Sequence, residues 1–241
     1  MSSTATNQLV ETLASYEDVA VEYYDGDRHP TCRDLRELSQ RFLVAHIRAG
    51  FSNNGSLIEV GPGRSILAPE AAAAGVLSRV VLIDSSPSML SYSTPWITGG
   101  AHAVAASADA TDLPSGTVSL IVSSLGDPYN CSEFWQEVAR LITPDGSCLF
   151  TTPSFEWSAS FRPRDNREVA EFLRADGARL FMPSRVYQAE EQIAMIEAAG
   201  LMVEERQGLN TKMLNREPAP KLRCIDSTCP VVSAYVVRLP R

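Results

Sequence analysis

The chain has 241 residues, of which 44% are hydrophobic and 21% are charged, and its formal net charge is −8. This composition suits a globular α/β domain with additions, and the acidic balance argues against general binding to a nucleic-acid backbone. The apolar runs are too short to span a membrane. The first residues hold neither a basic region nor an apolar core, so we expect no signal peptide and a cytoplasmic protein.

Two further features limit the kinds of site. The five cysteines form no spacing typical of a metal centre, so we expect no bound metal. Between positions 206 and 223 the charge is reversed, with five basic residues and one acid. An acidic protein can therefore still present a positive rim at one cleft.

The first 54 residues are predicted to form an N-terminal helical cap. Leu35, Leu38, Phe42 and Ala45 follow the spacing of one helix face, and Thr31 is a candidate N-cap. A polar, aromatic loop precedes this helix and contains His29. Imidazole can accept a proton at neutral pH, which makes His29 a candidate general base, although a lone histidine is often structural.

From residue 57 onward, predicted strands and helices alternate. We expect strands at 57–60, 79–84, 102–107, 118–124, 147–152, 201–206 and 231–239, and helices at 67–74, from 87, from 131 and at 187–199. Asn130 is a candidate N-cap for the third of these helices. Such βαβ repetition predicts a parallel, doubly wound sheet. The last strand follows its predecessor without a crossover helix, which predicts that it runs antiparallel.

The first strand of this series breaks into a glycine turn. Glu59 precedes the turn, Gly61 and Gly63 form it, and Asp84 closes the next strand. Glycines let the backbone turn sharply and approach a ligand, and an acid in the place of Asp84 can accept hydrogen bonds from both ribose hydroxyls. The pattern therefore predicts a nucleoside site. An NAD-binding domain shares these features, but its third glycine would fall at position 66, where Ile66 stands.

Several motifs in order resemble the class I S-adenosylmethionine-dependent methyltransferases. Glu59-Val-Gly-Pro-Gly63 resembles the nucleotide-binding loop, and Ile83-Asp-Ser-Ser-Pro-Ser-Met-Leu90 resembles the motif of the second strand. Ala108-Asp-Ala-Thr-Asp-Leu-Pro114 resembles the segment beside the adenine, and residues 138–153 resemble the helix, turn and fifth strand. The resemblance implies a seven-stranded, mostly parallel Rossmann-like sheet with an antiparallel last strand and helices on both faces. It implies a methyltransferase domain over residues 55–241, with substrate-side insertions at 154–185 and 207–229.

The resemblance also implies that S-adenosylmethionine is the methyl donor and which residues bind it. These are Glu59, Gly61, Pro62, Gly63, Asp84, Ser85, Met89, Asp109, Ala110 and Ser124. A structural alternative stays open for several of them. The glycines can serve a tight turn alone, Asp84 can cap a helix, Asp109 can form a turn, and Glu59 can bond to a backbone amide.

The acceptor side is less defined by the sequence. Residues 16–32, 154–185 and 207–229 are expected to lie over the carboxyl ends of the strands, where loops usually determine specificity. Asp127-Pro128-Tyr129 resembles, with one proline missing, the motif with which amino-methylating relatives hold a nitrogen. His29, Asp127 and Tyr129 are therefore the candidate catalytic residues, and Trp157 and Phe161 are candidate pocket walls.

We therefore expect in-line methyl transfer to a small-molecule acceptor, which the basic stretch suggests carries a carboxylate or phosphate. The accepting atom (O, N or C) and the oligomeric state are not specified by the sequence. Two alternatives stay open: a nucleic-acid amino-group methyltransferase that uses Asp127-Pro128-Tyr129, and a non-catalytic binding subunit with the same fold.

Overall fold

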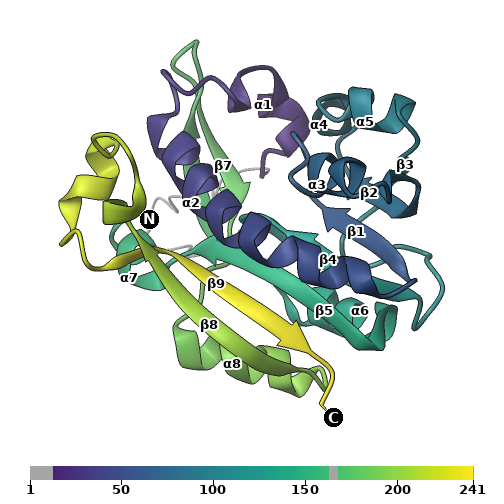
Figure 1. The fold of residues 1–241 in the computed structure, drawn as a ribbon. Helices are drawn as coiled ribbons and strands as arrows, with labels where there is room; N and C mark the ends of the chain where they lie inside the picture. Colours follow the sequence, from purple (N-terminus) through teal and green to yellow (C-terminus); the bar gives the residue numbers. More distant parts are fainter. Residues whose placement is uncertain (1–12, 163–167, 241) are drawn as a thin grey trace, which may run out of the picture.

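A seven-stranded sheet forms the centre of the molecule (Figure 1). The computed structural model describes residues 13–162 and 168–240. The sheet consists of β1 (Ser56–Val60), β2 (Val80–Asp84), β3 (His102–Ala105), β4 (Val118–Ser123), β5 (Ile142–Pro153), β8 (Met202–Asn210) and β9 (Pro230–Arg238). Its strand order is β3-β2-β1-β4-β5-β9-β8.

The strand directions confirm the fold class expected from the sequence. Strands β1 to β5 are parallel to one another, whereas β9 lies between β5 and β8 and is antiparallel to both. Strands β1, β2 and β3 follow one another outward on one side of the sheet, and β4 and β5 lie on the other side of β1. The direction in which strands are added therefore reverses between the parallel neighbours β1 and β4. In open parallel sheets, ligands bind at the carboxyl ends of the strands at such a point.

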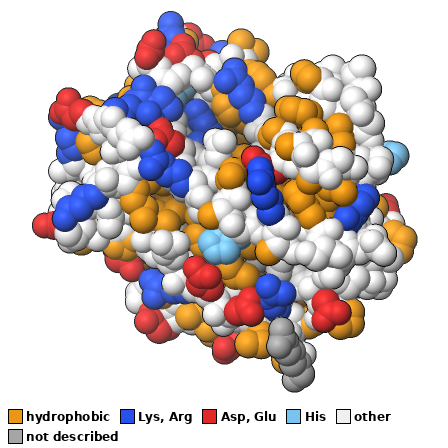
Figure 2. Space-filling model, in the orientation of Figure 1, with side chains coloured by type: hydrophobic (Ala, Val, Ile, Leu, Met, Phe, Trp, Pro, Cys, Tyr) orange, Lys and Arg blue, Asp and Glu red, His pale blue; other side chains and the backbone are white. Residues whose placement is uncertain are grey.

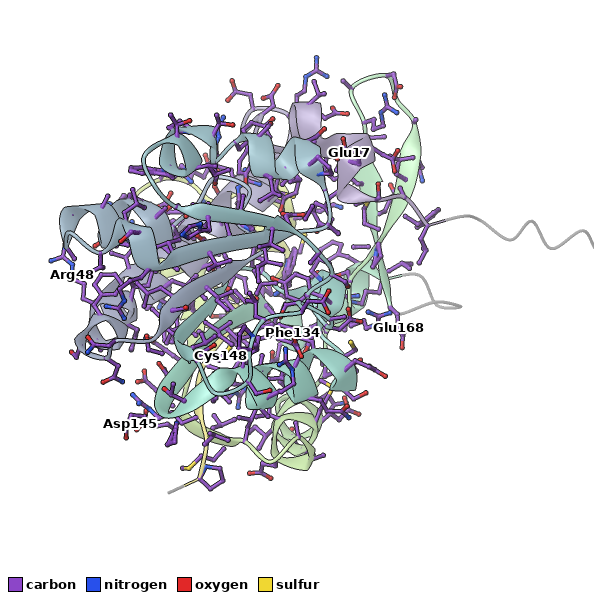
Figure 3. All side chains as sticks on the ribbon, turned by 90° about the vertical axis from the view of Figure 1, so that its right-hand side faces the viewer. Glu17, Arg48, Phe134, Asp145, Cys148 and Glu168 are labelled. Atoms are coloured by element: carbon purple, nitrogen blue, oxygen red, sulfur yellow. The ribbon has the colours of Figure 1, made fainter. Side chains whose placement is uncertain are left out.

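Alternating residues of the strands face two separate hydrophobic cores. Leu57 and Leu82 pack in one core with helices α2 (Pro30–Ile47) and α3 (Leu67–Ala73). Ile58 and Ile83 pack in the other core with α6 (Ser132–Leu141) and α8 (Ala189–Ala198). Phe134 and Cys148 of this second core are labelled in Figure 3. The period of two along each strand thus assigns apolar side chains to both faces, and helices cover both.

Further short helices connect these elements. They are α1 (Tyr16–Tyr23), α4 (Pro87–Ser91), α5 (Thr94–Thr98) and α7 (Phe155–Ser158), with the 3-10 helices η1 (Arg48–Ser52), η2 (Leu77–Arg79), η3 (Asp127–Tyr129), η4 (Ala159–Phe161), η5 (Thr211–Met213) and η6 (Pro220–Cys224). In the described residues, no helix combines the length and the apolar character needed to cross a membrane.

The helix starts differ from the sequence predictions at two positions. Helix α2 begins at Pro30 with His29 as N-cap residue, so Thr31 lies inside the first turn. Proline suits the first turn because its missing N–H needs no partner there. Helix α6 has Cys131 as N-cap residue instead of Asn130. The predicted face of α2 is also wrong at one residue, because Ala45 is exposed while Leu43 and Ile47 are buried.

The amide of Asn130 is used inside the protein. Its Nδ2 donates to Oε1 of Gln192 on α8 (2.6 Å), and its Oδ1 accepts from Nε1 of Trp135 (3.0 Å). Asparagine is a common N-cap, which is why the sequence suggested that role. Here the buried amide joins α6 to α8, and this long-range partner is not visible in the local sequence.

Residues 154–185 contain regular structure, which the sequence analysis did not predict. Strands β6 (Val169–Leu173) and β7 (Arg179–Pro183) form an antiparallel hairpin. Phe172 and Met182 of the hairpin pack against Val19 of α1 in a small third core. Figure 1 shows α1 and the hairpin beside each other on one side of the sheet.

The segment 207–229 is fixed to α2 by a buried acid. Asp34 is fully buried, and Arg216 donates to its Oδ1 through Nε (3.1 Å) and Nη2 (2.8 Å). The backbone N–H of Ala219 donates to Oδ2 of the same carboxylate (2.8 Å). Residues 207–210 continue β8, so the strand is longer than the predicted 201–206.

Candidate active site

The glycine turn after β1 adopts the left-handed backbone that its sequence predicts. Gly61 has φ +61° and Gly63 has φ +46°, a region that side chains disfavour. A Cβ on Gly63 would lie 2.0 Å from Oη of Tyr24, so this position also needs glycine for space. The Gly61 N–H donates to the carbonyl oxygen of Ile83 (2.8 Å), which joins the turn to the end of β2.

Glu59 lies beneath this turn and braces it. Its side chain is 1% exposed, and its carboxylate accepts from the backbone N–H groups of Ile66 (2.8 Å) and Leu67 (3.1 Å) and from Oγ of Ser65. Burial raises the pKa of Glu59 to about 7, against the lowering effect of these hydrogen bonds. Glu59 therefore binds the backbone at the start of α3. Among the described residues that line the two cavities at the strand ends, Glu59 is not included.

Asp84 stands at the carboxyl end of β2, beside the glycine turn. The backbone N–H of Ser86 donates to its Oδ1 (2.9 Å). Burial raises the pKa of Asp84 to about 6, and the nearby Glu17 carboxylate acts in the same direction. Ser85 and Met89 follow Asp84 on the same side of the cavity.

A cavity of about 850 Å³ opens over the glycine turn. Gly61, Pro62, Asp84, Ser85, Met89 and Ser124 of the predicted binding residues line it. Ala106, Ser107 and Ala108 form the wall beyond β3. The cavity therefore joins a left-handed glycine turn, a carboxylate and a small-residue wall, which is the set of groups that a nucleoside ligand needs.

Asp109 and Ala110 are not brought to this wall. Both are exposed, and the carboxylate of Asp109 accepts a hydrogen bond from Oγ of Ser107. Gly63 and Glu59 also lie outside the lining, although both support the turn. The segment beside β3 thus contributes residues 106–108 in the structure, just before the two residues that the motif suggested.

The N-terminal cap closes one side of the cavity. Tyr24 lies on the glycine turn, and its Oη accepts from the backbone N–H of Arg64 (2.7 Å). The guanidinium groups of Arg36 and Arg64 lie 4.8 Å and 4.6 Å from the centre of the Tyr24 ring. These cation–π contacts fix the ring over the turn.

Helix α1 is also attached to the start of α4. Glu17, labelled in Figure 3, accepts from the N–H of Ser88 (3.1 Å) and from the Oγ atoms of Ser86 (2.5 Å) and Ser88. A carboxylate at the first turn of a helix satisfies its free N–H groups. The cap therefore contacts both the glycine turn and the segment after Asp84.

Tyr129 lies on the floor of this first cavity. Its hydroxyl donates to the carbonyl oxygen of Val60 (2.9 Å) and accepts from Oγ of Ser123 (2.9 Å). Burial raises the pKa of Tyr129, so the phenol is neutral. Ser124 lines the same cavity, and its hydroxyl pairs with Oγ of Ser39 (2.7 Å).

A second cavity of about 460 Å³ adjoins the first. Its walls come from all three segments that were expected over the strand ends, including Trp157, Phe161 and Phe172 as aromatic walls. Tyr16, Tyr23, Leu125 and Pro183 line both cavities. We call these four residues the neck.

Asp127 and His29 belong to the second cavity, whereas Tyr129 belongs to the first. The structure thus separates the candidate catalytic residues into two groups. The change from one cavity to the other occurs within η3, and Leu125, two residues before η3, has φ +52°. A left-handed non-glycine residue is uncommon, and such backbone strain is concentrated at functional sites.

The carboxylate of Asp127 is held by a polar network. It is 7% exposed, and its Oδ2 accepts from Oγ of Ser184, which in turn accepts from Nη2 of Arg162 (3.0 Å). Burial raises the pKa of Asp127 to about 6, while Ser184 and the Arg162 charge oppose the rise. Arg162 and Ser184 were not predicted, because they join Asp127 only through the folding of the hairpin.

His29 lies against the wall of the second cavity. Its ring centre is 4.3 Å from that of Phe172, and its Nε2 is 3.5 Å from Oε2 of Glu22. The buried Nε2 has no hydrogen-bond partner among the described residues. Glu22 also accepts from the N–H of Ala175 in the β6–β7 hairpin (2.8 Å).

Tyr16, Tyr24 and Arg36 are site residues that the sequence analysis did not single out. Tyr23 and Tyr24 belong to the polar, aromatic loop that also contains His29. The dense aromatic spacing in residues 16–24 was a usable signal, because three tyrosines occur there in nine residues. Without the fold, however, an aromatic cluster on a short helix is indistinguishable from ordinary packing.

Comparisons with known proteins agree with this geometry. Residues 58–150 match the family model of a methyltransferase domain. No curated protein sequence matches the chain.

Several solved structures share the fold. The CcbJ methyltransferase from Streptomyces caelestis is 16% identical, with a TM-score of 0.61 over 94% of this chain and 97% of that one. An S-adenosylmethionine-dependent methyltransferase from Clostridium acetobutylicum is 12% identical, with a TM-score of 0.59 over 86% and 92%. The 1,6-didemethyltoxoflavin-N1-methyltransferase from Burkholderia thailandensis is 15% identical, with a TM-score of 0.53 over 95% and 92%.

The domain match covers the first five strands of the sheet up to Phe150, including the glycine turn and Asp84. The likeness to the solved structures extends beyond this match, to 94% of the chain for the CcbJ methyltransferase. The chain therefore contains a match to a methyltransferase domain over residues 58–150 and has the fold of the S-adenosylmethionine-dependent methyltransferases.

Proposed function

We propose that this methyltransferase acts on a small-molecule acceptor that binds in the second cavity. The observation that carries the proposal is the shared neck, because a donor in the first cavity and an acceptor in the second would meet there. Methyl transfer depends mainly on proximity and alignment of the two reactants. Adjoining cavities with a common wall supply this alignment.

The first cavity suits S-adenosylmethionine in size and chemistry. At about 850 Å³ it lies in the range of ligand pockets, and it combines the glycine turn with the Asp84 carboxylate. Asp84 would bind the ribose hydroxyls, residues 106–108 would contact the adenine, and Tyr129 would support the ligand from below. When bound, S-adenosylmethionine supplies an electrophilic methyl group that the acceptor atom takes from the sulfonium sulfur, with release of S-adenosylhomocysteine.

Asp127 and His29 are the proposed proton acceptors on the acceptor side. An O–H or N–H acceptor loses a proton as it gains the methyl group, and a base in the same cavity can take it. Asp127 has a pKa of about 6, so it is ionised at neutral pH and suited to this role. Glu22, 3.5 Å from Nε2 of His29, would stabilise the protonated imidazole.

Lys221 supports an acceptor that carries an anionic group. In the basic stretch, Arg206, Arg216 and Arg223 each form an ion pair with an acid. Lys221 lines the second cavity, and its Nζ lies 5.6 Å from the centre of the Phe161 ring. Figure 2 shows Lys and Arg side chains over this part of the surface, mixed with acids. The proposal that the acceptor carries a carboxylate or phosphate therefore rests on Lys221, the residue of the basic stretch that lines the second cavity.

The geometry favours a small molecule over a nucleic acid. In an amino-group methyltransferase of nucleic acids, the aromatic residue of the motif stacks on the base. Here the Tyr129 ring lies in the first cavity, and its hydroxyl is tied to Val60 and Ser123. The matched enzyme from Burkholderia thailandensis is named for 1,6-didemethyltoxoflavin, which supports an acceptor that is not a nucleic acid.

Transfer of a radiolabelled methyl group tests the proposal. The protein is incubated with methyl-labelled S-adenosylmethionine and, separately, with a panel of aromatic amines, phenols and their carboxylated forms, with total RNA and with duplex DNA. We expect label in a small-molecule product, and a large loss of turnover in Asp127→Asn with unchanged binding of S-adenosylhomocysteine. Label in nucleic acid alone would contradict the proposal.

A further inference from the structure

The second cavity lies between two separate groups of aromatic side chains. Trp157 and Phe161 pack in the core that contains α2 and α3, whereas Phe172 belongs to the small core of the hairpin and α1. The ring centres are 5.5 Å apart for Trp157 and Phe161, and 4.3 Å apart for Phe172 and His29. All four residues line the cavity. Aromatic rings attract one another in offset or edge-to-face contacts, so a planar aromatic ligand suits a cavity between these two aromatic groups.

His29 adds a polar atom that the described residues leave without a hydrogen-bond partner. Its side chain is 9% exposed, and Nε2 accepts or donates no hydrogen bond among the described residues. The Glu22 carboxylate lies 3.5 Å from this nitrogen and forms an ion pair only when the ring is protonated. Buried polar groups normally have partners. The cavity therefore suits a ligand that brings a hydroxyl or amino group to the aromatic wall.

Asp127 lies at the end of the second cavity that is nearest to the first. Leu125, two residues before it, and Pro183 both belong to the neck. Ser184, the residue after Pro183, donates to the Asp127 carboxylate. A hydroxyl or amino group that receives a methyl group from the first cavity must lie at this end, where Asp127 can take its proton.

Lys221 lies away from the neck. None of the described residues in the segment 207–229 lines the first cavity, and Lys221 lines only the second. Its carbonyl oxygen accepts from Nε1 of Trp157 (2.9 Å), and its Nζ lies 5.6 Å from the centre of the Phe161 ring. The ammonium group is therefore beside one of the two aromatic groups, at a part of the cavity that the donor does not reach.

The charge of Lys221 is available to a ligand. Among the described residues that line the second cavity, the other lysine or arginine side chains are Arg28 and Arg162. Arg28 pairs with Asp25 (3.3 Å), and Arg162 donates to Oγ of Ser184 (3.0 Å). Lys221 has no acidic partner in the described part of the chain. One ammonium group balances the single negative charge of a carboxylate.

We propose that the acceptor is an aromatic carboxylic acid whose ring lies between the two aromatic groups of the second cavity. Its carboxylate pairs with Lys221, and a hydroxyl or amino group at the opposite end of the ring faces Asp127 and His29. This inference rests on the proposed function and names the class of acceptor at the same site.

The ring acts as a spacer between the two ends of the cavity. In transfer, the hydroxyl or amino group gives its proton to Asp127 or His29 while its oxygen or nitrogen forms the bond to the methyl carbon. The bond from the methyl carbon to sulfur breaks, and sulfur keeps the electron pair. The carboxylate stays ionised beside Lys221 throughout. An isomer with both groups side by side on the ring cannot reach both ends.

Small probes test the ring, the charge and their spacing separately. 4-Hydroxybenzoate has all three features, and 2-hydroxybenzoate has its groups side by side. 4-Hydroxybenzyl alcohol lacks the charge, and 4-hydroxycyclohexanecarboxylate lacks the aromatic ring. Binding to the protein saturated with S-adenosylhomocysteine is measured by NMR titration. We expect 4-hydroxybenzoate to bind roughly threefold to tenfold more tightly than each of the others, the scale of one aromatic contact or one exposed ion pair.

Lys221→Met tests the charged end, because it removes the ammonium group and keeps an apolar stem. The affinity for 4-hydroxybenzoate should fall about twofold to fivefold, whereas the affinity for 4-hydroxybenzyl alcohol should not change. Lys212→Met is the matched control, since Lys212 is an exposed lysine of the same segment that lines neither cavity. It should change neither affinity.

Phe161→Leu tests the aromatic wall, because it keeps an apolar side chain and removes the ring. The preference for 4-hydroxybenzoate over 4-hydroxycyclohexanecarboxylate should shrink by about twofold or more. Phe51→Leu is the control, since Phe51 packs against the same core and lines neither cavity. It should leave this preference unchanged.

The outcomes separate this inference from the proposed function. If the four probes bind equally or not at all at millimolar concentration, or if Lys221→Met weakens the neutral probe as much as the acid, the inference is wrong. Transfer of labelled methyl to a non-aromatic small molecule alone would also overturn it, and the proposed function would stand. If the protein does not bind S-adenosylhomocysteine, or labels nucleic acid alone, the proposed function fails and the inference fails with it.

Discussion

At the scale of single residues, two acids that neighbour the same turn have different tasks. Asp84 faces the first cavity, whereas Glu59 is sealed beneath the turn and bonds to the backbone of α3. The sequence presented both as candidate ligands of the donor. The structure supports a binding role for Asp84 and a bracing role for Glu59, because burial and hydrogen-bond partners differ although the residue types are alike.

Removal of the Asp84 carboxylate should weaken donor binding strongly. Asp84→Ala is expected to lose about 2–3 kcal/mol of binding free energy, roughly 30- to 150-fold in Kd, because two charge-assisted hydrogen bonds to the ribose disappear. His29→Ala should change the affinity less than about twofold, since His29 lines only the second cavity. Calorimetry with S-adenosylhomocysteine measures both, and equal effects would contradict the assignment of the two cavities.

The affinity for the donor should also depend on pH through Asp84. Its pKa is raised to about 6 in the free protein, and the protonated carboxyl cannot accept from both ribose hydroxyls. Affinity for S-adenosylhomocysteine should therefore fall as the pH falls through about 6. An Asp84→Asn variant should bind weakly with no such dependence between pH 5 and 8, and a wild-type profile that is flat over this range would argue against Asp84 as the ribose ligand.

Glu59 should make folding stability depend on pH in a predictable direction. Its pKa is about 7 when folded and near 4.5 in an ordinary environment, so the folded state holds the proton more tightly. The stabilisation is present below about pH 4.5 and is lost as the pH rises through 7, which amounts to on the order of 3 kcal/mol.

Urea unfolding of wild type and Glu59→Gln at pH 5 and pH 8 isolates this contribution. Asp84 and Asp127 also have raised pKa values, but both remain in the variant and cancel in the comparison. Wild type should lose more stability between the two pH values than Glu59→Gln does. An identical loss in the two proteins would show that Glu59 is not protonated in this range.

At the scale of elements, the strand ends form part of the cavity walls, and the N-terminal cap and the β6–β7 hairpin form the rest. The cap contacts the glycine turn through Tyr24, the residue after α1, and the start of α4 through Glu17. Ser184, the residue after the hairpin, donates to Asp127. The strands and the glycine turn follow local patterns of period and turn residues, so the sequence predicted them correctly. The cap and hairpin contacts join residues far apart in the chain, and no local pattern encodes such partners.

Contact between the cap and the glycine turn can be tested by a pair of glycine substitutions. Gly63→Ala places a Cβ 2.0 Å from Oη of Tyr24, whereas Gly75→Ala meets nothing within 4 Å. Both positions have a left-handed backbone, with φ +46° and φ +73°, so both substitutions cost about 1 kcal/mol from strain alone. Only Gly63→Ala should lose additional stability and donor affinity.

A double variant tells whether the extra loss comes from Tyr24. In Gly63→Ala/Tyr24→Phe the clashing oxygen is absent, so the added cost should largely disappear, and the two changes should be non-additive. Stability is measured by urea unfolding and affinity by calorimetry. Strictly additive effects would mean that Tyr24 does not lie on the turn.

At the scale of the whole molecule, two adjoining cavities lie at the strand ends, and in the proposed function one binds the donor and the other the acceptor. The sheet positions the donor side through β1 and β2, which the sequence patterns specify well. The acceptor side is built from the three segments that the sequence placed over the strand ends without specifying their structure. Its Asp127 and His29 were predicted as site residues, but their separation from Tyr129 depends on how the turn of η3 folds, which residue spacing does not reveal.

Binding of S-adenosylhomocysteine and NAD to the wild-type protein, measured by calorimetry under the same conditions, tests the central claim most directly. The glycine turn and Asp84 alone suit either ligand, whereas Ile66 and the antiparallel β9 favour the methyl donor. We predict binding of S-adenosylhomocysteine at a single site in the micromolar range, about −8 kcal/mol, and no binding of NAD. Binding of NAD, or no binding of S-adenosylhomocysteine at millimolar concentration, would contradict the account.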